Sequence, residues 1–175
     1  MLDAARARFA AVGYDRTRIR DVAADAGVDP ALVHYFFKSK DGLFTAVMEL
    51  PFSPADMLAP LLASGVEGLG ERLVRRVLTI WDDPGNRAAL LAMLRGASSR
   101  PEAAAALREF LMREVIGRVA AAVGEPLRAN LVGSQIVGLI VARYVVGVQP
   151  LAGLEREEVV RLVAPTIQRY LDGPL

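Results

Sequence analysis

The apolar residues of this chain recur at helical spacing along most of its length, and this periodicity restricts its fold more than any other feature. Segment 2–12 places Leu2, Ala5, Phe9 and Val12 on one stripe. No stretch alternates apolar and polar residues as a half-buried strand does. With 53% apolar and 23% charged residues, the chain is too apolar to be disordered. The sequence therefore predicts an all-α protein.

Composition excludes several classes of protein. Cysteine is absent, which excludes disulfides and a cysteine-based zinc site and suits a reducing cytoplasm. Residues 1–20 do not show the cationic and then apolar regions of a secretory signal. Segment 131–148 approaches the length of a membrane span, but Arg143 at a bilayer centre would cost about 2.5 to 3.5 kcal/mol. We therefore expect a cytoplasmic protein with no membrane partner and a protein-covered helix in that segment.

Capping residues divide the first fifty residues into four short helices. The first helix, 2–12, ends at Gly13, and Thr17 is expected to cap a second helix that ends at Gly27. Asp29 followed by Pro30 is typical of a helix start, so a third helix begins there. A fourth helix is expected to be capped by Ser39 and closed by Pro51.

Beyond residue 51 the helices become longer, which predicts a domain boundary: a first domain of residues 1–50 and a second of residues 51–175. The later helices are expected over 68–82, 86–97, 102–123, 127–147 and 155–172. Helix 102–123 has one buried face, with Glu109/Arg113 and Glu114/Arg118 paired on its outer side. Helix 127–147 is apolar around nearly its whole circumference, so it must be covered on several sides. Its glycines, Gly133, Gly138 and Gly147, are expected to allow close approach of another helix.

Residues 18–36 contain two short helices joined by a tight turn at 26–29, which is a helix-turn-helix arrangement. Gly27 can take the left-handed conformation and Val28 can fill the space between the helices. Val33 and Phe37 continue the buried side of the second helix. The outward side is then left to Asp29, Pro30, Ala31, His34 and Tyr35. A helix presented in this way fits the DNA major groove.

Basic residues flank this helix pair, although the first fifty residues hold seven basic and seven acidic side chains. The flanking set is Arg16, Arg18, Arg20, Lys38 and Lys40. These could be ordinary solvated helix starts. Their position around the tight turn instead favours contacts with DNA phosphates.

The segment from Phe9 to Val47, FAAVGYDRTRIRDVAADAGVDPALVHYFFKSKDGLFTAV, resembles the DNA-binding domain of TetR-family transcriptional regulators. The features that carry the resemblance are Gly13, Thr17, Ala26-Gly27-Val28, Phe37, Ser39-Lys40 and Leu43. Residues 51–175 are similar, less specifically, to the regulatory domain of actinobacterial members. The resemblance implies an N-terminal three-helix helix-turn-helix domain followed by a C-terminal helical domain for ligand binding and dimerisation.

The family also implies roles for individual residues, with Pro30–Phe36 as the recognition helix and Lys40 on phosphate. The DNA-contacting set is Thr17, Arg18, Arg20, Asp29, Pro30, Ala31, Leu32, His34, Tyr35, Lys38 and Lys40. His34 stands where a tyrosine is usual and Leu32 where a threonine is usual, and Leu32 could contact a thymine methyl group. The basic extension usual before the first helix is not seen, so either the true start lies upstream or this member lacks that arm.

Other functions have less support. The motifs of nucleotide-binding loops, zinc proteases, serine hydrolases and calcium loops are absent, so we expect no enzyme activity and no cofactor. Gly65, Gly68 and Gly70 do not follow a strand and are expected to form a connection between helices. His34 is the only histidine, which makes a metal site a poor interpretation.

A small-molecule effector site is expected in the C-terminal domain. Its candidate lining is Met57, Leu58, Leu61, Trp81, Met93, Phe110, Met112 and Arg143, since methionines and aromatic residues suit apolar ligands. The alternative is that these residues only fill the core. Arg143 would meet either a ligand carboxylate or an acidic side chain, because an unpaired buried charge is prohibitive.

Together these patterns predict a homodimeric one-component repressor. Dimerisation through 127–147 and 155–172 would place two recognition helices on a palindromic DNA operator, and an unknown small-molecule effector would release it. The alternative is an all-α protein-interaction module that does not bind DNA.

Overall fold

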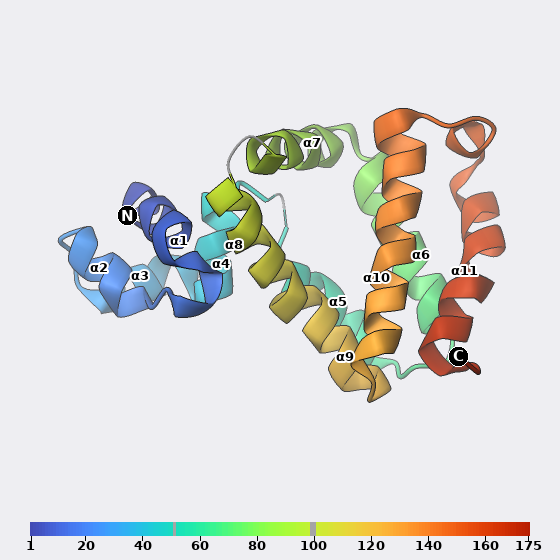
Figure 1. Cartoon of the computed structure of the whole chain (residues 1–175), viewed down its shortest axis with the longest axis horizontal. Coiled ribbons are helices and arrows are strands. Elements are labelled where there is room, and N and C mark those ends of the chain that lie inside the picture. Colours follow the sequence, from blue (N-terminus) through green and yellow to red (C-terminus); the bar gives the residue numbers. More distant parts are fainter. Residues whose placement is uncertain (51, 99–100) are drawn as a thin grey trace. The chain divides into compact units, whose positions relative to one another are not determined.

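The computed structural model describes residues 1–50, 52–98 and 101–175, and this part of the chain is built from helices, turns and loops without a strand (Figure 1). The all-α prediction is confirmed. The chain divides into two compact units. Unit 1 comprises Met1–Pro54 and Ala89–Glu114, and unit 2 comprises Ala55–Ala88 and Val115–Leu175.

Unit 1 packs four short N-terminal helices and one later helix around an aromatic core. The helices are α1 (Leu2–Arg16), α2 (Ile19–Asp25), α3 (Pro30–Phe37), α4 (Lys40–Val47) and α8 (Pro101–Leu111). Phe44 is fully buried, and its ring centroid lies 4.8 Å from that of Phe9 and 4.6 Å from that of Phe110. Edge-to-face and stacked aromatic pairs of this kind add to the stabilisation from burial alone. The core therefore joins α1 and α4 to α8, a helix distant in sequence.

The predicted starts of α3 and α4 are confirmed. The Asp29 carboxylate accepts a hydrogen bond from the backbone N–H of Ala31 at 2.7 Å, and Pro30 occupies the first turn. The Ser39 hydroxyl accepts one from the backbone N–H of Gly42 at 3.0 Å. Each such cap typically contributes about 1 kcal/mol. Gly27 has a φ of +64°, as the tight turn requires.

The connection between α1 and α2 differs from the prediction. Helix α1 continues to Arg16, although Gly13 is non-helical within it. Thr17 does not cap α2: its buried hydroxyl donates to the Gly13 carbonyl at 2.7 Å, and Arg18 is the N-cap residue without a side-chain bond. The prediction that Thr17 caps α2 was wrong because its hydroxyl instead forms a hydrogen bond with the carbonyl of the non-helical Gly13. Helix α4 ends at Val47, and the expected stop at Pro51 lies outside the described residues.

Unit 2 is built mainly on two helices that pack along each other, α6 (Leu69–Asp82) and α11 (Arg156–Asp172). A Cβ atom at Gly70 would lie 2.8 Å from the backbone nitrogen of Gln168 and 2.9 Å from the backbone oxygen of Ala164. Only glycine therefore permits this close approach. The other elements of this unit are α5 (Pro54–Ala63), α9 (Gly117–Val123), α10 (Pro126–Ile140) and a short 3-10 turn, η3 (Leu151–Gly153), and the division between the two units falls within α7 (Pro84–Ser98).

The helix expected over 102–123 is interrupted by a π-helical segment, η1 (Met112–Ile116), between α8 and α9. Glu114 is buried rather than exposed on the outer side, so its predicted position was wrong. Glu114 is buried because it packs against a residue distant in sequence: its carboxylate accepts a hydrogen bond from the Tyr14 hydroxyl at 3.4 Å. A π-helical turn of this kind is typical of functional sites and carries one extra residue in the turn.

The helix expected over 127–147 forms as α10 followed by a π-helical segment, η2 (Val141–Val146). Among the described residues, Pro126–Val146 is the one helix whose length and apolar composition would suffice to cross a membrane. Only 17% of its most apolar stretch is buried, so the expected cover on several sides is not provided by the single chain. Gly133 does approach another element, the Ile116 side chain, whereas Gly138 has no neighbour within 4 Å of a Cβ position.

Candidate nucleic-acid interface

Helix α3 lies on the outside of unit 1 and is anchored by one side. Val33 is fully buried in the core of unit 1, and Val28 and Phe37 are partly buried against the same core. The other positions of the helix are exposed, namely Pro30, Ala31, Leu32, His34, Tyr35 and Phe36. The helix-turn-helix prediction is therefore matched by a helix whose N-terminal half is open to a partner.

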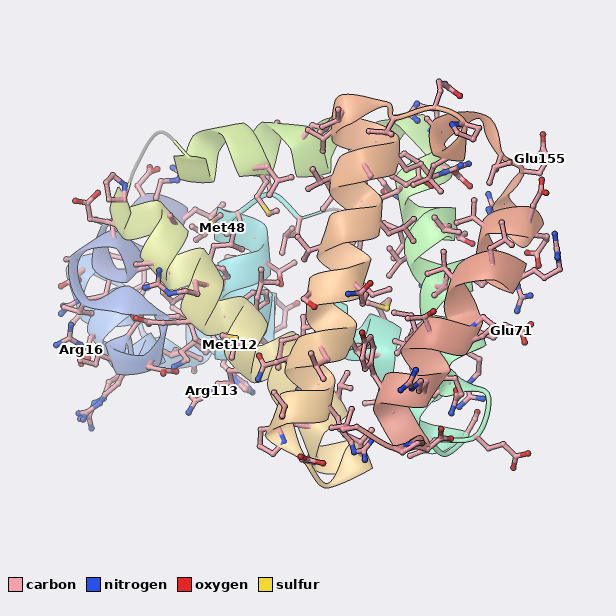
Figure 2. All side chains as sticks on the ribbon, turned by 45° about the vertical axis from the view of Figure 1, so that its right-hand side comes forward. Arg16, Met48, Glu71, Met112, Arg113 and Glu155 are labelled. Atoms are coloured by element: carbon pink, nitrogen blue, oxygen red, sulfur yellow. The ribbon has the colours of Figure 1, made fainter. Side chains whose placement is uncertain are left out.

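Three arginines at the end of α1 and the start of α2 are exposed. Arg18 makes no ion pair or side-chain hydrogen bond with the described part of the chain, so its guanidinium is available. Arg16 donates from Nε to the Val12 carbonyl at 3.0 Å and extends into solvent (Figure 2). Arg20 lies 3.7 Å from the Asp21 carboxylate and is 68% exposed. These side chains form a local basic edge beside the helix-turn-helix.

Two lysines lie at the other end of α3, and their environments differ. Lys38 is exposed, with its ammonium 5.2 Å from the centre of the Tyr35 ring. Lys40 is partly buried and donates from Nζ to the backbone carbonyls of Tyr14 at 3.1 Å and Asp15 at 3.2 Å. Burial, and then the nearby positive charge of Arg113, lower the pKa of Lys40. Lys40 therefore neutralises the carbonyl end of α1 within the protein.

A polar network holds that same end of α1 against α8 and η1. Arg113 pairs with the Asp15 carboxylate at 3.0 Å, and the Asp15 backbone N–H donates to Glu109 at 3.1 Å. The buried Tyr14 hydroxyl donates to Glu114; burial and then the negative charge of Glu114 raise the pKa of Tyr14. These contacts attach the end of α1, which carries Arg16, to α8 and η1.

The structure separates the predicted DNA-contacting residues into three groups. The exposed group is Arg18, Arg20, Pro30, Ala31, Leu32, His34, Tyr35 and Lys38. Asp29 is exposed, but one carboxylate oxygen already caps α3. The third group is Thr17, whose side chain is buried, and Lys40, which is partly buried and donates from Nζ to backbone carbonyls of α1. Phe36, which is not among the predicted DNA-contacting residues, is 57% exposed. Its spacing of four from Leu32 is the signal that could have found it.

The candidate effector residues of unit 2 lie mainly in its core. Leu58 is fully buried, and Met57 and Leu61 pack against the same core cluster. Trp81 is buried and stacks on Tyr144 with a centroid distance of 5.6 Å. These four residues fill space between helices in the single chain.

Three other candidate effector residues belong to unit 1. Phe110 is fully buried in the aromatic core, and Met93 packs against that core. Met112 is instead 48% exposed (Figure 2). The structure therefore does not gather the candidate lining into one cavity within either unit.

Within the described residues, the Arg143 guanidinium forms its hydrogen bonds with backbone carbonyls and not with an acidic side chain. Its guanidinium donates to the backbone carbonyls of Leu151 and Leu154, the latter at 2.7 Å. It also borders a pocket of about 550 Å³. The other residues that line this pocket are Asp82, Leu154, Glu155, Arg156 and Glu157.

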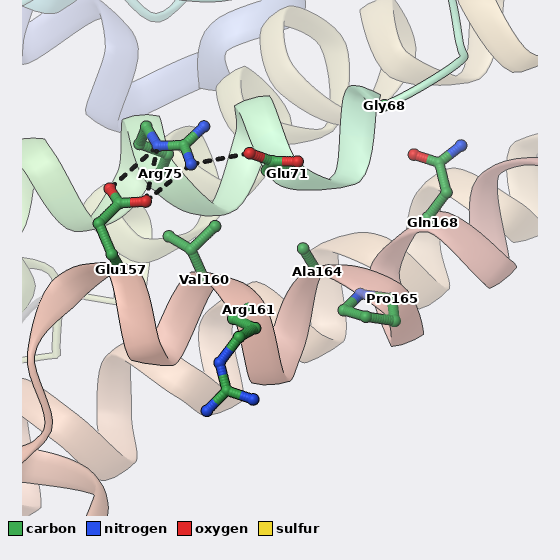
Figure 3. A pocket seen from close by; sticks show the side chains of 9 residues that line it. All are labelled: Gly68, Glu71, Arg75, Glu157, Val160, Arg161, Ala164, Pro165 and Gln168. Atoms are coloured by element: carbon green, nitrogen blue, oxygen red, sulfur yellow. Dashed lines mark hydrogen bonds and ion pairs between the residues drawn. The ribbon is translucent and has the colours of Figure 1, made fainter.

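A second pocket of about 550 Å³ lies over α6 and α11 and contains none of the candidate effector residues (Figure 3). Arg75 binds Glu157 and Glu71 at 2.7 Å each at one end of it. Its lining is Gly68, Glu71, Arg75, Glu157, Val160, Arg161, Ala164, Pro165 and Gln168. Within the described residues no group of three or more histidines and carboxylates is placed to hold a metal ion.

Comparison with known proteins agrees with this arrangement. Residues 1–47 match the family described as bacterial regulatory proteins, tetR family, and residues 67–171 match the tetracyclin repressor-like C-terminal domain. A crystal structure of a TetR-family regulator from Streptomyces coelicolor A3 is 37% identical, with a TM-score of 0.54, over 97% of this chain and 91% of that one. No curated protein matches the chain. The helix-turn-helix, the matched C-terminal domain and this relative together show that the chain belongs to the TetR family of DNA-binding transcriptional regulators.

Proposed function

We propose that this protein is a homodimeric repressor that binds a palindromic DNA operator and is released from it by a small molecule bound in its C-terminal domain. The observation that carries the proposal is the exposed side of α3, anchored by the buried Val33 and flanked by the free Arg18. A helix in the major groove places its N-terminal residues at base edges, while flanking arginines bind phosphates. Operator binding also places the protein in the cytoplasm, and it requires no catalytic turnover.

Dimerisation is proposed through the exposed side of α10 and η2, with α11 beside it. Val137, Val141 and Val145 follow one another at helical spacing and are 59%, 42% and 50% exposed. An apolar stripe of this length on a water-facing helix is typical of an interface. A second copy of the chain would cover it by a two-fold contact of the same stripe. Two recognition helices held about 34 to 36 Å apart, or a multiple of it, would then match a palindrome.

The dimer is tested by Val141→Glu, which places a charge in the middle of the stripe. We expect a monomer in sedimentation equilibrium where the unmodified protein is a dimer, with helical content retained because Val141 is already exposed in the single chain. Arg76→Glu, on an exposed face of α6, is the control for adding a carboxylate. A Val141→Glu variant that remains dimeric would refute this interface.

Effector release is proposed to act through the geometry of the dimer. A ligand that binds one dimer arrangement more tightly shifts the population toward it, and moving from 99:1 to 1:99 requires a preference of about 5.5 kcal/mol. We propose that the effector binds in the pocket beside Arg143. The Arg143 guanidinium holds the segment between η2 and α11, so a ligand in this pocket can act on that segment. Displacement of Arg143 from the carbonyls of Leu151 and Leu154 would free that segment.

A salt titration of DNA affinity separates the proposal from the alternative, a helical module that binds only proteins. DNA fragments bound from a genomic pool would be recovered, and their affinity measured between about 50 and 200 mM salt. Regulation by DNA binding predicts that the logarithm of affinity falls linearly with the logarithm of salt concentration, by about 0.9 for each neutralised phosphate. No bound DNA, or an affinity that does not respond to salt, would favour the protein-interaction module.

A further inference from the structure

Helix α3 presents few groups that can form hydrogen bonds with base edges. The side chains that usually make paired contacts with guanine or adenine are arginine, lysine, asparagine and glutamine, and none occurs within α3, where Lys38 is the first such residue after its end. Asp29 has one carboxylate oxygen engaged in capping α3. Only His34 and Tyr35 remain on the helix as exposed polar side chains. Most of the exposed side chains of α3 therefore cannot form hydrogen bonds with base edges.

The same surface presents large apolar side chains. Leu32 is 41% exposed and Phe36 is 57% exposed, and because they are four residues apart they share one face of the helix. The Phe36 and Tyr35 rings form a T-shaped pair with a centroid distance of 5.2 Å, and the centroid of the Phe37 ring lies 6.4 Å from that of Phe36. Exposed apolar side chains that share one face and have polar residues around them are typical of an interaction site.

The charges near Leu32 and Phe36 indicate which kind of partner binds this surface. Arg18 and Arg20 at the start of α2 and Lys38 at the end of α3 are exposed cations, so a polyanion is favoured over an uncharged protein surface. On DNA, the apolar group that a side chain meets at the major-groove edge of a base is the 5-methyl group of thymine. From these observations we infer that Leu32 and Phe36 recognise thymine methyl groups, and that the operator half-site carries thymines at the positions these two side chains reach.

This inference rests on the proposed function and adds the chemical group that is read. The test begins with the full-length protein and a random pool of DNA duplexes, from which bound sites are selected. Each thymine of a selected half-site is then replaced singly by deoxyuridine, which keeps every hydrogen-bonding group and removes only the methyl. We expect about a fourfold loss of affinity at one or two positions in each half-site, the effect of uncovering one buried methyl group.

Two variants assign the methyl groups to side chains. Leu32→Ala and Phe36→Ala should each bind the thymine and deoxyuridine forms equally well at one position while remaining sensitive at the other. Arg18→Ala is the matched control, because losing a phosphate contact should weaken both forms equally and leave their ratio unchanged. Circular dichroism would verify that all three variants retain their helices, as their exposed side chains predict.

The outcomes distinguish this inference from the function on which it rests. Salt-dependent binding to a selected site whose affinity does not change at any thymine-to-deoxyuridine position would overturn the methyl recognition and leave the repressor proposal intact. Selected half-sites without thymine would do the same. Failure to select any DNA would overturn both.

Discussion

Among single residues, the basic side chains around α3 divide into those that face solvent and those used inside the protein. Arg18 has no partner in the described part of the chain. Lys40 instead donates to two carbonyls at the end of α1, with its ammonium 4.4 Å from the centre of the Tyr14 ring. The sequence places both beside the helix-turn-helix and cannot separate them, because no local pattern shows that the Lys40 ammonium reaches the Tyr14 and Asp15 carbonyls, 25 or more residues before it.

Arg18→Ala is expected to weaken binding to all DNA sequences by a similar factor and to reduce the salt slope by about 0.9. The reason is the loss of one phosphate contact without any loss of folding, since Arg18 supports nothing within unit 1. Fluorescence anisotropy with labelled duplexes at several salt concentrations measures both quantities. Arg76→Ala removes an exposed arginine from α6 as a control and should leave the slope unchanged. An unchanged slope for Arg18→Ala would contradict the assignment.

Lys40→Met is expected to lower the free energy of unfolding by about 1 kcal/mol, because it leaves two carbonyls of α1 without their charged donor. Thermal unfolding followed by circular dichroism measures this change. Lys38→Met is the matched control, as its exposed ammonium contacts only the Tyr35 ring and its loss should change stability little. A full unit lost from the salt slope, with stability unaltered, would show that Lys40 contacts phosphate instead.

At the scale of helices, the sequence predicted what local chemistry determines. The caps at Asp29 and Ser39, the positive φ of Gly27 and the buried position of Val33 all follow from neighbouring residues. Two local predictions failed: Thr17 binds the Gly13 carbonyl four residues before it instead of capping α2, and Glu114 is buried against Tyr14, which lies 100 residues away in the sequence. Phe36 was missed because residue type alone does not show which of three consecutive aromatic rings is exposed, whereas its spacing of four from Leu32 does.

Gly70→Ala is expected to destabilise unit 2 by about 2 kcal/mol, because the added methyl group would meet the α11 backbone at Gln168 and Ala164. Chemical denaturation followed by circular dichroism measures the loss. Gly138→Ala is the control within α10, where no atom lies within 4 Å and the alanine should stabilise the helix by up to about 1 kcal/mol. Both changes are made in the Val141→Glu background so that association does not contribute. Equal stability of the two variants would contradict the close packing of α6 on α11.

At the scale of the whole molecule, the sequence predicted the family and the helical class but not the arrangement of distant segments. Residues 89–114 belong to the same compact unit as the first 54, although they lie beyond the predicted boundary near residue 51. The aromatic contact between Phe44 and Phe110 is one cause, and no local pattern indicates it. The candidate effector set was drawn from residue type alone, and the structure distributes it between two cores.

The acid and alkaline limits of stability are expected to depend on Asp82, which joins three segments of unit 2. Its carboxylate accepts hydrogen bonds from Tyr144 and Arg156, at 2.7 Å each. Burial raises the pKa of Asp82, but these bonds outweigh it and hold the pKa below its ordinary value of 3.8. The carboxylate thus contributes stability above that value, which is lost as the pH falls through the lower folded pKa. Asp82→Asn should flatten the decline in unfolding free energy below about pH 5.

The Tyr144 hydroxyl has the opposite dependence. Burial, and then its hydrogen bond to Asp82, raise the pKa of Tyr144 from 10.0 to about 12. The neutral hydroxyl therefore contributes stability that is present below pH 10.0 and lost as the pH rises through 12. Tyr144→Phe should lessen the alkaline decline and leave most of the acid decline in place. Denaturant titrations across the pH range measure both variants, and profiles parallel to that of the unmodified protein would contradict these roles.

Trp81 is the only tryptophan of the chain, and it stacks on Tyr144 within unit 2. Indole emission from the unmodified protein consequently reports on unit 2 alone. A change in its intensity or wavelength would follow a small molecule entering that unit without any attached dye, whereas docking of α3 on DNA would be followed by the polarisation of a labelled duplex. Recording both signals from one sample would show whether the small molecule binds before the protein leaves the DNA.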